Sequence, residues 1–168
     1  FLDCAYIEFA DEDYYSLLSA ENLIIGRTLS KVYGLAGLRI GYAFVPEWFV
    51  GPYMAGVTPF SLNCVSEAAG VAALENPSCR DRLVSHVRAW RKRFEDEIPF
   101  PVLPSGANFV LINTAPLKSD DAVVQLQKKG VLVRSCSSFP GLGDTYIRVS
   151  IGDDWENERF LSAVKELC

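Results

Sequence analysis

The sequence predicts an α/β fold in two parts. In residues 1–45, short apolar segments alternate with loops rich in small and polar residues, a pattern typical of an α/β sheet covered on both faces. After a proline-rich connection at residues 99–104, the predicted order strand, helix, strand, strand, helix indicates a compact α+β unit. We place the boundary at Asn76–Pro77, so that residues 1–76 and 77–168 form the two predicted domains.

The first part contains three predicted strands and two predicted helices. The strands are short apolar runs at residues 1–9, 22–26 and 38–45. One helix is predicted over residues 46–54, and a second begins at a cap formed by Ser61 or Asn63 and ends near Glu75. A turn rich in glycine and other small residues, at 30–37, separates the second and third strands.

The second part begins with a long amphipathic helix, from a cap at Ser78 to just before Pro99. Its apolar residues follow the helical period and are Leu83, Val87, Trp90, Phe94 and Ile98. His86, the single histidine, falls off this stripe and is expected to be solvated. The remaining predicted elements are strands at 107–113, 131–134 and 146–151 and helices at 119–129 and 155–167.

The charge balance limits the function classes. The net charge is −5, and binding to nucleic-acid phosphates usually needs a basic face, so we expect no nucleic-acid partner. No apolar run is long enough to span a bilayer, and the N-terminus lacks a signal-peptide pattern. We therefore expect a cytoplasmic protein without a membrane partner.

The cysteines and the first residue add two further expectations. The five cysteines include no C-x-x-C pair, and the single histidine has no second ligand nearby, so we expect reduced thiols and no metal site. The chain opens at Phe1, without Met and directly in strand-like sequence. We expect from this that the N-terminal part of a longer protein is absent.

The segment with the most distinctive chemistry lies between the second and third predicted strands. It combines the hydroxyls of Thr28 and Ser30, the amine of Lys31 and the guanidinium of Arg39 with several glycines. Hydroxyls and an arginine can hold a phosphate, and lysine is the side chain that forms an imine with an aldehyde cofactor. These residues alone leave an ordinary surface loop with a solvated lysine as an equal alternative, and the P-loop pattern is absent.

A second unusual residue is Arg148, which interrupts an apolar predicted strand. Burying a guanidinium costs free energy unless an anion pairs with it. The residue pattern leaves two interpretations, a structural salt bridge or a site for an anionic ligand.

Several motifs together resemble one family. Residues 30–42 read S-K-V-Y-G-L-A-G-L-R-I-G-Y and resemble the cofactor-lysine motif of the class I/II aminotransferases, which are fold-type I enzymes dependent on pyridoxal 5'-phosphate (PLP). The closest resemblance is to the histidinol-phosphate aminotransferase branch. The D-C-A-Y sequence at residues 3–6 is similar to the family's D-E-A-Y, with Cys4 in place of glutamate. A third match is Y-I-R-V-S-I-G at 146–152, and two weaker matches at 59–63 and 105–109 also agree with the family's order.

The resemblance covers nearly the whole chain and implies both a fold and residue roles. Residues 1–76 would complete the PLP-binding large domain, and residues 77–168 would form the small C-terminal α+β domain. Lys31 would form the imine with PLP and later move the substrate's Cα proton. Asp3 would pair with the protonated pyridine nitrogen, which keeps the ring an electron sink, and Tyr6 would hydrogen-bond the phenolic oxygen. The residues implied to hold the cofactor phosphate are Thr28, Ser30 and Arg39.

The resemblance also implies substrate-binding residues in the second domain. Arg148 would grip the substrate α-carboxylate in a bidentate pair. Arg159 would bind the substrate phosphate, although a solvated helix arginine is an equal alternative. Asn108 would position substrate or, equally, cap a turn. The D-D-W sequence at 153–155 departs from the family's G-T-P-E type of link, and two acids near an anion site put the phosphate role of Arg159 in doubt.

The implied activity is transamination between histidinol phosphate and 2-oxoglutarate, in amino-acid biosynthesis, by a homodimer with its active site at the subunit interface. One alternative is a threonine-phosphate decarboxylase of cobamide synthesis, because residues 134–142 resemble that family's R-x-C-x-x-F-P-G-L loop. An alternative of another class is a non-catalytic fragment. The family's N-terminal half supplies a phosphate loop, an asparagine and a stacking aromatic, and none of these can be located in this sequence.

Overall fold

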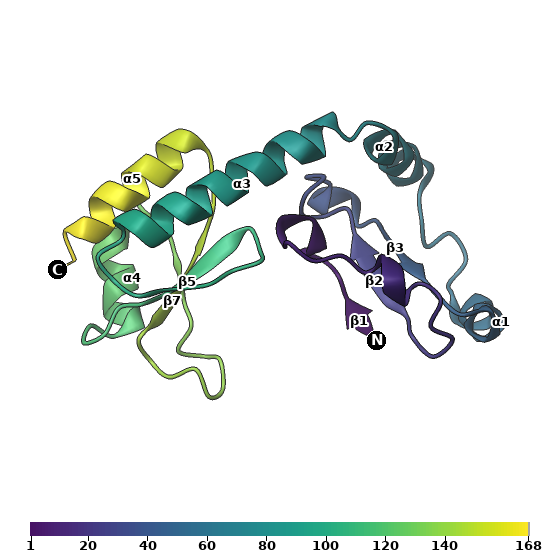
Figure 1. Ribbon diagram of the computed structural model, residues 1–168, viewed down its shortest axis with the longest axis horizontal. Coiled ribbons are helices and arrows are strands. Elements are labelled where there is room, and N and C mark those ends of the chain that lie inside the picture. Colours follow the sequence, from purple (N-terminus) through teal and green to yellow (C-terminus); the bar gives the residue numbers. More distant parts are fainter. Residues whose placement is uncertain (168) are drawn as a thin grey trace. The chain divides into compact units, whose positions relative to one another are not determined.

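The structure is a computed structural model that describes residues 1–167 (Figure 1). The chain divides into two compact units, Phe1–Val84 and Ser85–Cys168, and each is described by itself. The predicted boundary at Asn76–Pro77 precedes this division, which falls inside helix α3 (Ser78–Glu97).

The first unit is built on a small mixed sheet. Its strands are β1 (Leu2–Asp3), β2 (Ile25–Thr28) and β3 (Gly41–Phe44), in the order β1-β2-β3. Strand β1 runs parallel to β2, and β3 runs antiparallel to it. A small core contains Cys4, Tyr14 and Ile25. Three short 3-10 helices interrupt the loops: η1 (Ile7–Phe9), η2 (Tyr15–Leu17) and η3 (Ala36–Leu38).

Two α-helices follow this sheet, α1 (Glu47–Gly56) and α2 (Cys64–Glu75). The side chain of Asn63 accepts a hydrogen bond from the backbone N–H of Ser66 (2.8 Å), which confirms the predicted cap of α2. The buried hydroxyl of Ser66 donates to the carbonyl of Leu38 (2.8 Å). The N-terminus of α2 is thereby attached to the loop that carries the lysine motif.

The second unit is an antiparallel sheet covered by helices. Its strands are β4 (Val102–Leu103), β5 (Phe109–Asn113), β6 (Arg134–Ser135) and β7 (Tyr146–Ser150), in the order β4-β5-β7-β6. Figure 1 shows α3, α4 (Ser119–Lys128) and α5 (Asp154–Lys165) beside this sheet. Residues of all three helices share one core with alternate residues of β5 and β7: Val110, Ile112, Ile147 and Val149. The residues between them, including Arg148, lie on the opposite face.

Several predicted strands are shorter than expected, and for two of them the structure shows a local reason. The predicted strand at 1–9 is β1 alone, because the Asp3 carboxylate accepts a hydrogen bond from the Ala5 N–H (3.0 Å) and the chain then enters η1. The predicted strand at 131–134 starts only at Arg134. The N–H of Val131 bonds to the Leu126 carbonyl (3.0 Å) and closes the end of α4 instead of joining the sheet.

Two further expectations were incomplete. The sequence did not predict β4, a strand of two residues inside the proline-rich connection. His86 is not simply solvated: its Nε2 lies 2.8 Å from the carbonyl oxygen of Gly152, and its ring is half-buried. His86 and the Trp90 indole, which donates to Asp154 (2.7 Å), attach α3 to the start of α5.

Candidate functional site

A cavity of about 360 Å³ in the first unit, the lysine pocket, brings together most of the residues predicted to bind the cofactor. Its lining includes Asp3, Gly26, Thr28, Ser30, Lys31 and Arg39. The hypothesis required the carboxylate of Asp3 and the amine of Lys31 to lie close enough to bracket one ring. Both side chains line this one pocket.

The sheet explains how residues distant in sequence reach the pocket. Parallel pairing of β1 with β2 places Asp3 beside Gly26. Strand β2 ends at Thr28, so the polar residues that follow it lie at the carboxyl end of a strand, where α/β sheets usually bind ligands. Lys31 Nζ lies 5.2 Å from the ring centroid of Tyr6, which places Tyr6 next to the lysine although it does not line the pocket.

The loop after β2 has an ordered, partly unusual backbone. The backbone N–H of Ser30 donates to Thr28 Oγ1 (3.1 Å). Arg39 adopts a left-handed conformation (φ 51°, ψ 45°) and donates from Nη1 to the Ala36 carbonyl (3.0 Å). Left-handed backbone is uncommon for a residue other than glycine and often occurs at functional sites. Glycine is required at position 41, because a Cβ there would lie 2.5 Å from the carbonyl oxygen of Arg27.

The groups lining the lysine pocket match the chemistry of PLP. Two hydroxyls and a guanidinium suit a phosphate, an amine suits an aldehyde, and a carboxylate suits a protonated pyridine nitrogen. This donor set lies in one cavity, so the residues present fit the cofactor.

A second cavity, of about 530 Å³, lies in the second unit, and we call it the arginine pocket. The residues of its lining that matter here are Arg134, Arg148, Trp155, Glu156 and Arg159. Arg134 and Arg148 are register partners on β6 and β7. Like charges directly opposite each other on neighbouring strands repel. Within residues 1–167, no ion pair joins either arginine to an acidic side chain, so the structure offers no salt bridge for Arg148.

The other two predicted substrate residues have different surroundings. The guanidinium of Arg159 donates to the carbonyl of Lys129 at the end of α4 (2.7 Å) and lies against Gly130. This contact stabilises a helix C-terminus, so part of Arg159 already has a structural partner. Asn108 is half-buried and lies just before β5, and its backbone carbonyl accepts from Ile151 N–H (2.9 Å).

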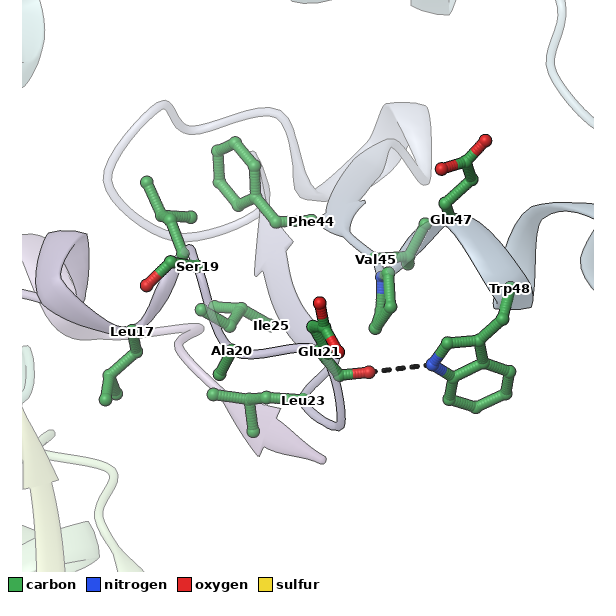
Figure 2. A pocket seen from close by; sticks show the side chains of 12 residues that line it. Leu17, Ser19, Ala20, Glu21, Leu23, Ile25, Phe44, Val45, Glu47 and Trp48 are labelled. Carbon is green, nitrogen blue, oxygen red and sulfur yellow. Dashed lines mark hydrogen bonds between the residues drawn. The ribbon is translucent and has the colours of Figure 1, made fainter.

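The pocket in Figure 2 contains none of the predicted site residues. It has a volume of about 550 Å³, is lined mainly by apolar side chains such as Leu23, Phe44 and Trp48, and offers no lysine, arginine or histidine. The Trp48 indole donates to the Glu21 carbonyl across its rim (2.7 Å). A phosphorylated aldehyde has no cation and no amine to bind here, whereas the lysine pocket offers both.

Two features of these sites were missed by the sequence analysis. Arg134 was noted only as part of a loop motif, and its position opposite Arg148 depends on strand register. Arg27 was given no role by the sequence analysis, yet its side chain is buried in an ion pair with Glu8. Burial disfavours its charge, but Glu8, Tyr42 and Tyr14 outweigh burial and raise the pKa of Arg27 above its usual value.

Other kinds of site find no support in the part of the chain that is described. Among residues 1–167, no cluster of three or more histidine, cysteine, aspartate or glutamate side chains is arranged to hold a metal ion. None of the helices formed by these residues has both the length and the apolar character needed to cross a membrane.

Comparisons with known proteins agree with the geometry. The histidinol-phosphate aminotransferase of Methanocorpusculum labreanum is 65% identical over 99% of this chain, which spans 48% of that protein. The solved histidinol-phosphate aminotransferase from Clostridium acetobutylicum has a TM-score of 0.91 at 28% identity, covering 98% of this chain and 52% of that one. A Sinorhizobium meliloti histidinol-phosphate aminotransferase, solved in complex with pyridoxal-5'-phosphate, has a TM-score of 0.85 at 29% identity (99% and 47% covered).

A decarboxylase also has a similar structure. The solved L-threonine-O-3-phosphate decarboxylase from Porphyromonas gingivalis has a TM-score of 0.79 at 25% identity, covering 98% of this chain and 53% of that chain. The chain spans about half the length of the curated relatives it matches. The family model described as aminotransferase class I and II matches residues 1–164. This chain therefore belongs to the class I and II aminotransferases, the pyridoxal-phosphate-dependent family that its lysine motif resembles.

Proposed function

We propose that this chain is the C-terminal part of an aminotransferase that transfers an amino group between histidinol phosphate and 2-oxoglutarate. The observation that carries the proposal is the lysine pocket, in which Asp3, Thr28, Ser30, Lys31 and Arg39 share one cavity. The similarity to histidinol-phosphate aminotransferases supports the choice of substrate. The whole protein is expected to act as a homodimer, and size-exclusion chromatography with light scattering tests this.

Each residue of the lysine pocket has a defined task in the proposed reaction. When bound, PLP supplies an electron sink for the bond that breaks at the substrate Cα. Lys31 Nζ holds the cofactor through its aldehyde carbon and, once freed, carries the proton away from Cα. The Asp3 carboxylate would hold a proton on the ring nitrogen by charge pairing. Tyr6 would orient the cofactor ring by a hydrogen bond to the phenolic oxygen of that ring. Thr28, Ser30 and Arg39 bind the phosphate.

Residues of the second unit bind the substrate in this proposal. Arg148 is the bidentate partner for the α-carboxylate of 2-oxoglutarate, and Arg134 supplies a second cation from the neighbouring strand. Asn108 positions the substrate near β5. Arg159 contributes to phosphate binding only with the N–H groups that the Lys129 carbonyl leaves available.

The test of the proposed function uses the complete gene product and PLP. We expect a visible absorbance band of lysine-bound cofactor, and we expect the Lys31→Ala variant to lose it while retaining its fold by circular dichroism. Lys128→Ala, at the end of α4, is the matched control. A band that survives in Lys31→Ala would overturn the proposal. A complete gene product that never binds PLP would also overturn the proposal.

A threonine-phosphate decarboxylase is the second candidate, because of the loop at residues 134–142 and the similar decarboxylase structure. In this loop the Arg134 guanidinium stacks on the Phe139 ring (5.0 Å to the centroid) and Cys136 is buried. Two assays separate the candidates. Glutamate formation from histidinol phosphate and 2-oxoglutarate supports the aminotransferase, and carbon dioxide release from O-phosphothreonine supports the decarboxylase.

A further inference from the structure

A cluster of Arg27, Glu8, Tyr14 and Tyr42 adjoins the lysine pocket, and Arg27 is also one of the residues that line it. The side chains of Arg27 and Glu8 are only 7% and 11% exposed and form an ion pair. Nη1 of Arg27 donates to the Tyr14 hydroxyl. Its guanidinium carbon lies 4.8 Å from the centroid of the Tyr14 ring and 5.6 Å from that of Tyr42. Arg27 is therefore held by one carboxylate and two aromatic rings.

A contribution to stability does not by itself explain this cluster. Withdrawing two charges from water costs free energy, which a buried pair recovers only when its remaining polar atoms are also satisfied. In the described chain, Arg27 Nε and Glu8 Oε2 are buried without a hydrogen-bond partner. Apolar residues of similar volume often stabilise a protein as well as such a pair does or better. Because these two buried atoms lack hydrogen-bond partners, the pair is better explained by the geometry that it fixes than by its contribution to the free energy of folding.

The ion pair joins the two segments that supply the lysine pocket. Glu8 lies in η1, five residues after Asp3 and two after Tyr6. Arg27 lies on β2, directly before Thr28 and four residues before Lys31. The sheet itself connects these segments weakly, because β1 pairs with β2 through only Leu2–Ile25 and Asp3–Gly26. The charged pair lies beyond the end of β1 and adds a second attachment there.

We propose that Arg27 and Glu8 are positioning residues that hold the Asp3–Tyr6 segment in register with Lys31. Neither residue is assigned a contact with the reacting atoms. The rings of Tyr14 and Tyr42 both lie against the Arg27 guanidinium. This inference rests on the proposed function, because it assumes that PLP binds in the lysine pocket.

The experiment replaces the pair by apolar residues in the complete gene product. The double variant Glu8→Leu/Arg27→Met keeps the buried volume and removes both charges, so it is expected to stay folded. We expect its dissociation constant for PLP to rise about tenfold, the range of coupling between contacting residues. We also expect a lower visible circular dichroism per bound cofactor at saturation, because that signal reports how rigidly the cofactor is held. Glu8→Gln, measured in parallel, should shift both readouts in the same direction.

A control variant separates positioning from stability. Ile25→Val removes one buried methylene from the same strand without touching the charges, so it should lower the melting temperature and leave both readouts unchanged. Wild-type affinity and wild-type dichroism in any folded charge variant would overturn the inference. A wild-type protein without a Lys31-dependent band would instead reject the proposed function, so the two failures are distinguishable.

Discussion

Among single residues, Arg148 and Arg134 are unusual because two positively charged side chains lie opposite each other in the sheet. They are register partners on neighbouring strands, and each stacks on a phenylalanine ring, Arg148 on Phe109 at 5.1 Å and Arg134 on Phe139 at 5.0 Å. Burial raises the pKa of the nearby Cys136 thiol, although both arginines act to lower it. A bound anion would relieve the repulsion between the two guanidinium groups, and this is the physical basis of the substrate-binding role that we propose for them.

The substitution Arg148→Lys tests this role. Lysine keeps the charge but loses the planar fork that binds a carboxylate bidentately. We expect KM for 2-oxoglutarate to rise about tenfold with a smaller change in kcat, because the lost contact serves binding of substrate and transition state alike. Steady-state kinetics measure both constants. The exposed Arg82→Lys is the matched control, and an unchanged KM in Arg148→Lys would contradict the assignment.

Among the α-helices of the first unit, α2 is hydrogen-bonded to the loop that carries the lysine motif. Its cap, Asn63, also donates from Nδ2 to the Ser66 hydroxyl (2.9 Å), and that hydroxyl bonds to the carbonyl of Leu38, one residue before Arg39. The helix start and the pocket loop are thus connected through two consecutive hydrogen bonds.

Removal of this cap should destabilise the first unit without abolishing its fold. We expect Asn63→Ala to lower the free energy of unfolding by about 1 kcal/mol, the usual cost of losing an N-cap side chain. Asn63→Asp keeps the acceptor oxygen for the Ser66 N–H and should retain most of the stability. Urea denaturation followed by far-UV circular dichroism measures the difference, and equal stabilities of the alanine and aspartate variants would show that the cap contributes nothing.

At the scale of the whole molecule, the first unit has more cysteine and tyrosine side chains with a raised pKa than the second unit. Three groups of the first unit, Cys4, Tyr14 and Tyr42, have pKa values raised chiefly by burial, although Arg27 acts to lower each of them. A raised pKa means that the folded state keeps its proton at a pH where the unfolded chain releases it. The stability contributed by protonated groups is therefore complete below their ordinary pKa and is lost as pH rises.

We accordingly expect the first unit to lose stability as pH rises into the alkaline range. The ordinary pKa values are 9.0 for the cysteine and 10.0 for the tyrosines, so the urea midpoint of the first unit should fall as pH rises from 9.0 upward. Fluorescence of Trp48, in a variant with Trp90→Phe and Trp155→Phe, reports this unit. Tyr42→Phe removes one of the three groups and should make the decline shallower, and a midpoint that stays constant above pH 10.0 would contradict the linkage.

The sequence alone was sufficient to predict features that depend on residues close together along the chain. The lysine motif is contiguous, so its hydroxyls, amine and guanidinium could be identified together. The Asn63 cap and the apolar stripe of α3 were predicted because caps and helical periodicity are local. Strand lengths were predicted less well. At Ala5 and Val131, a single local hydrogen bond takes the backbone N–H that sheet pairing would otherwise use.

Contacts between distant residues were decided by the tertiary structure. The meeting of Asp3 with Lys31 depends on the parallel pairing of β1 and β2, and the position of Arg134 opposite Arg148 depends on the register of β6 and β7. A shift of register by one residue would turn either side chain to the other face. The burial of Arg27 against Glu8, 19 residues away, left no periodic signal in the sequence. The residue types determined which chemistry was available, and strand pairing decided which groups could act on one ligand.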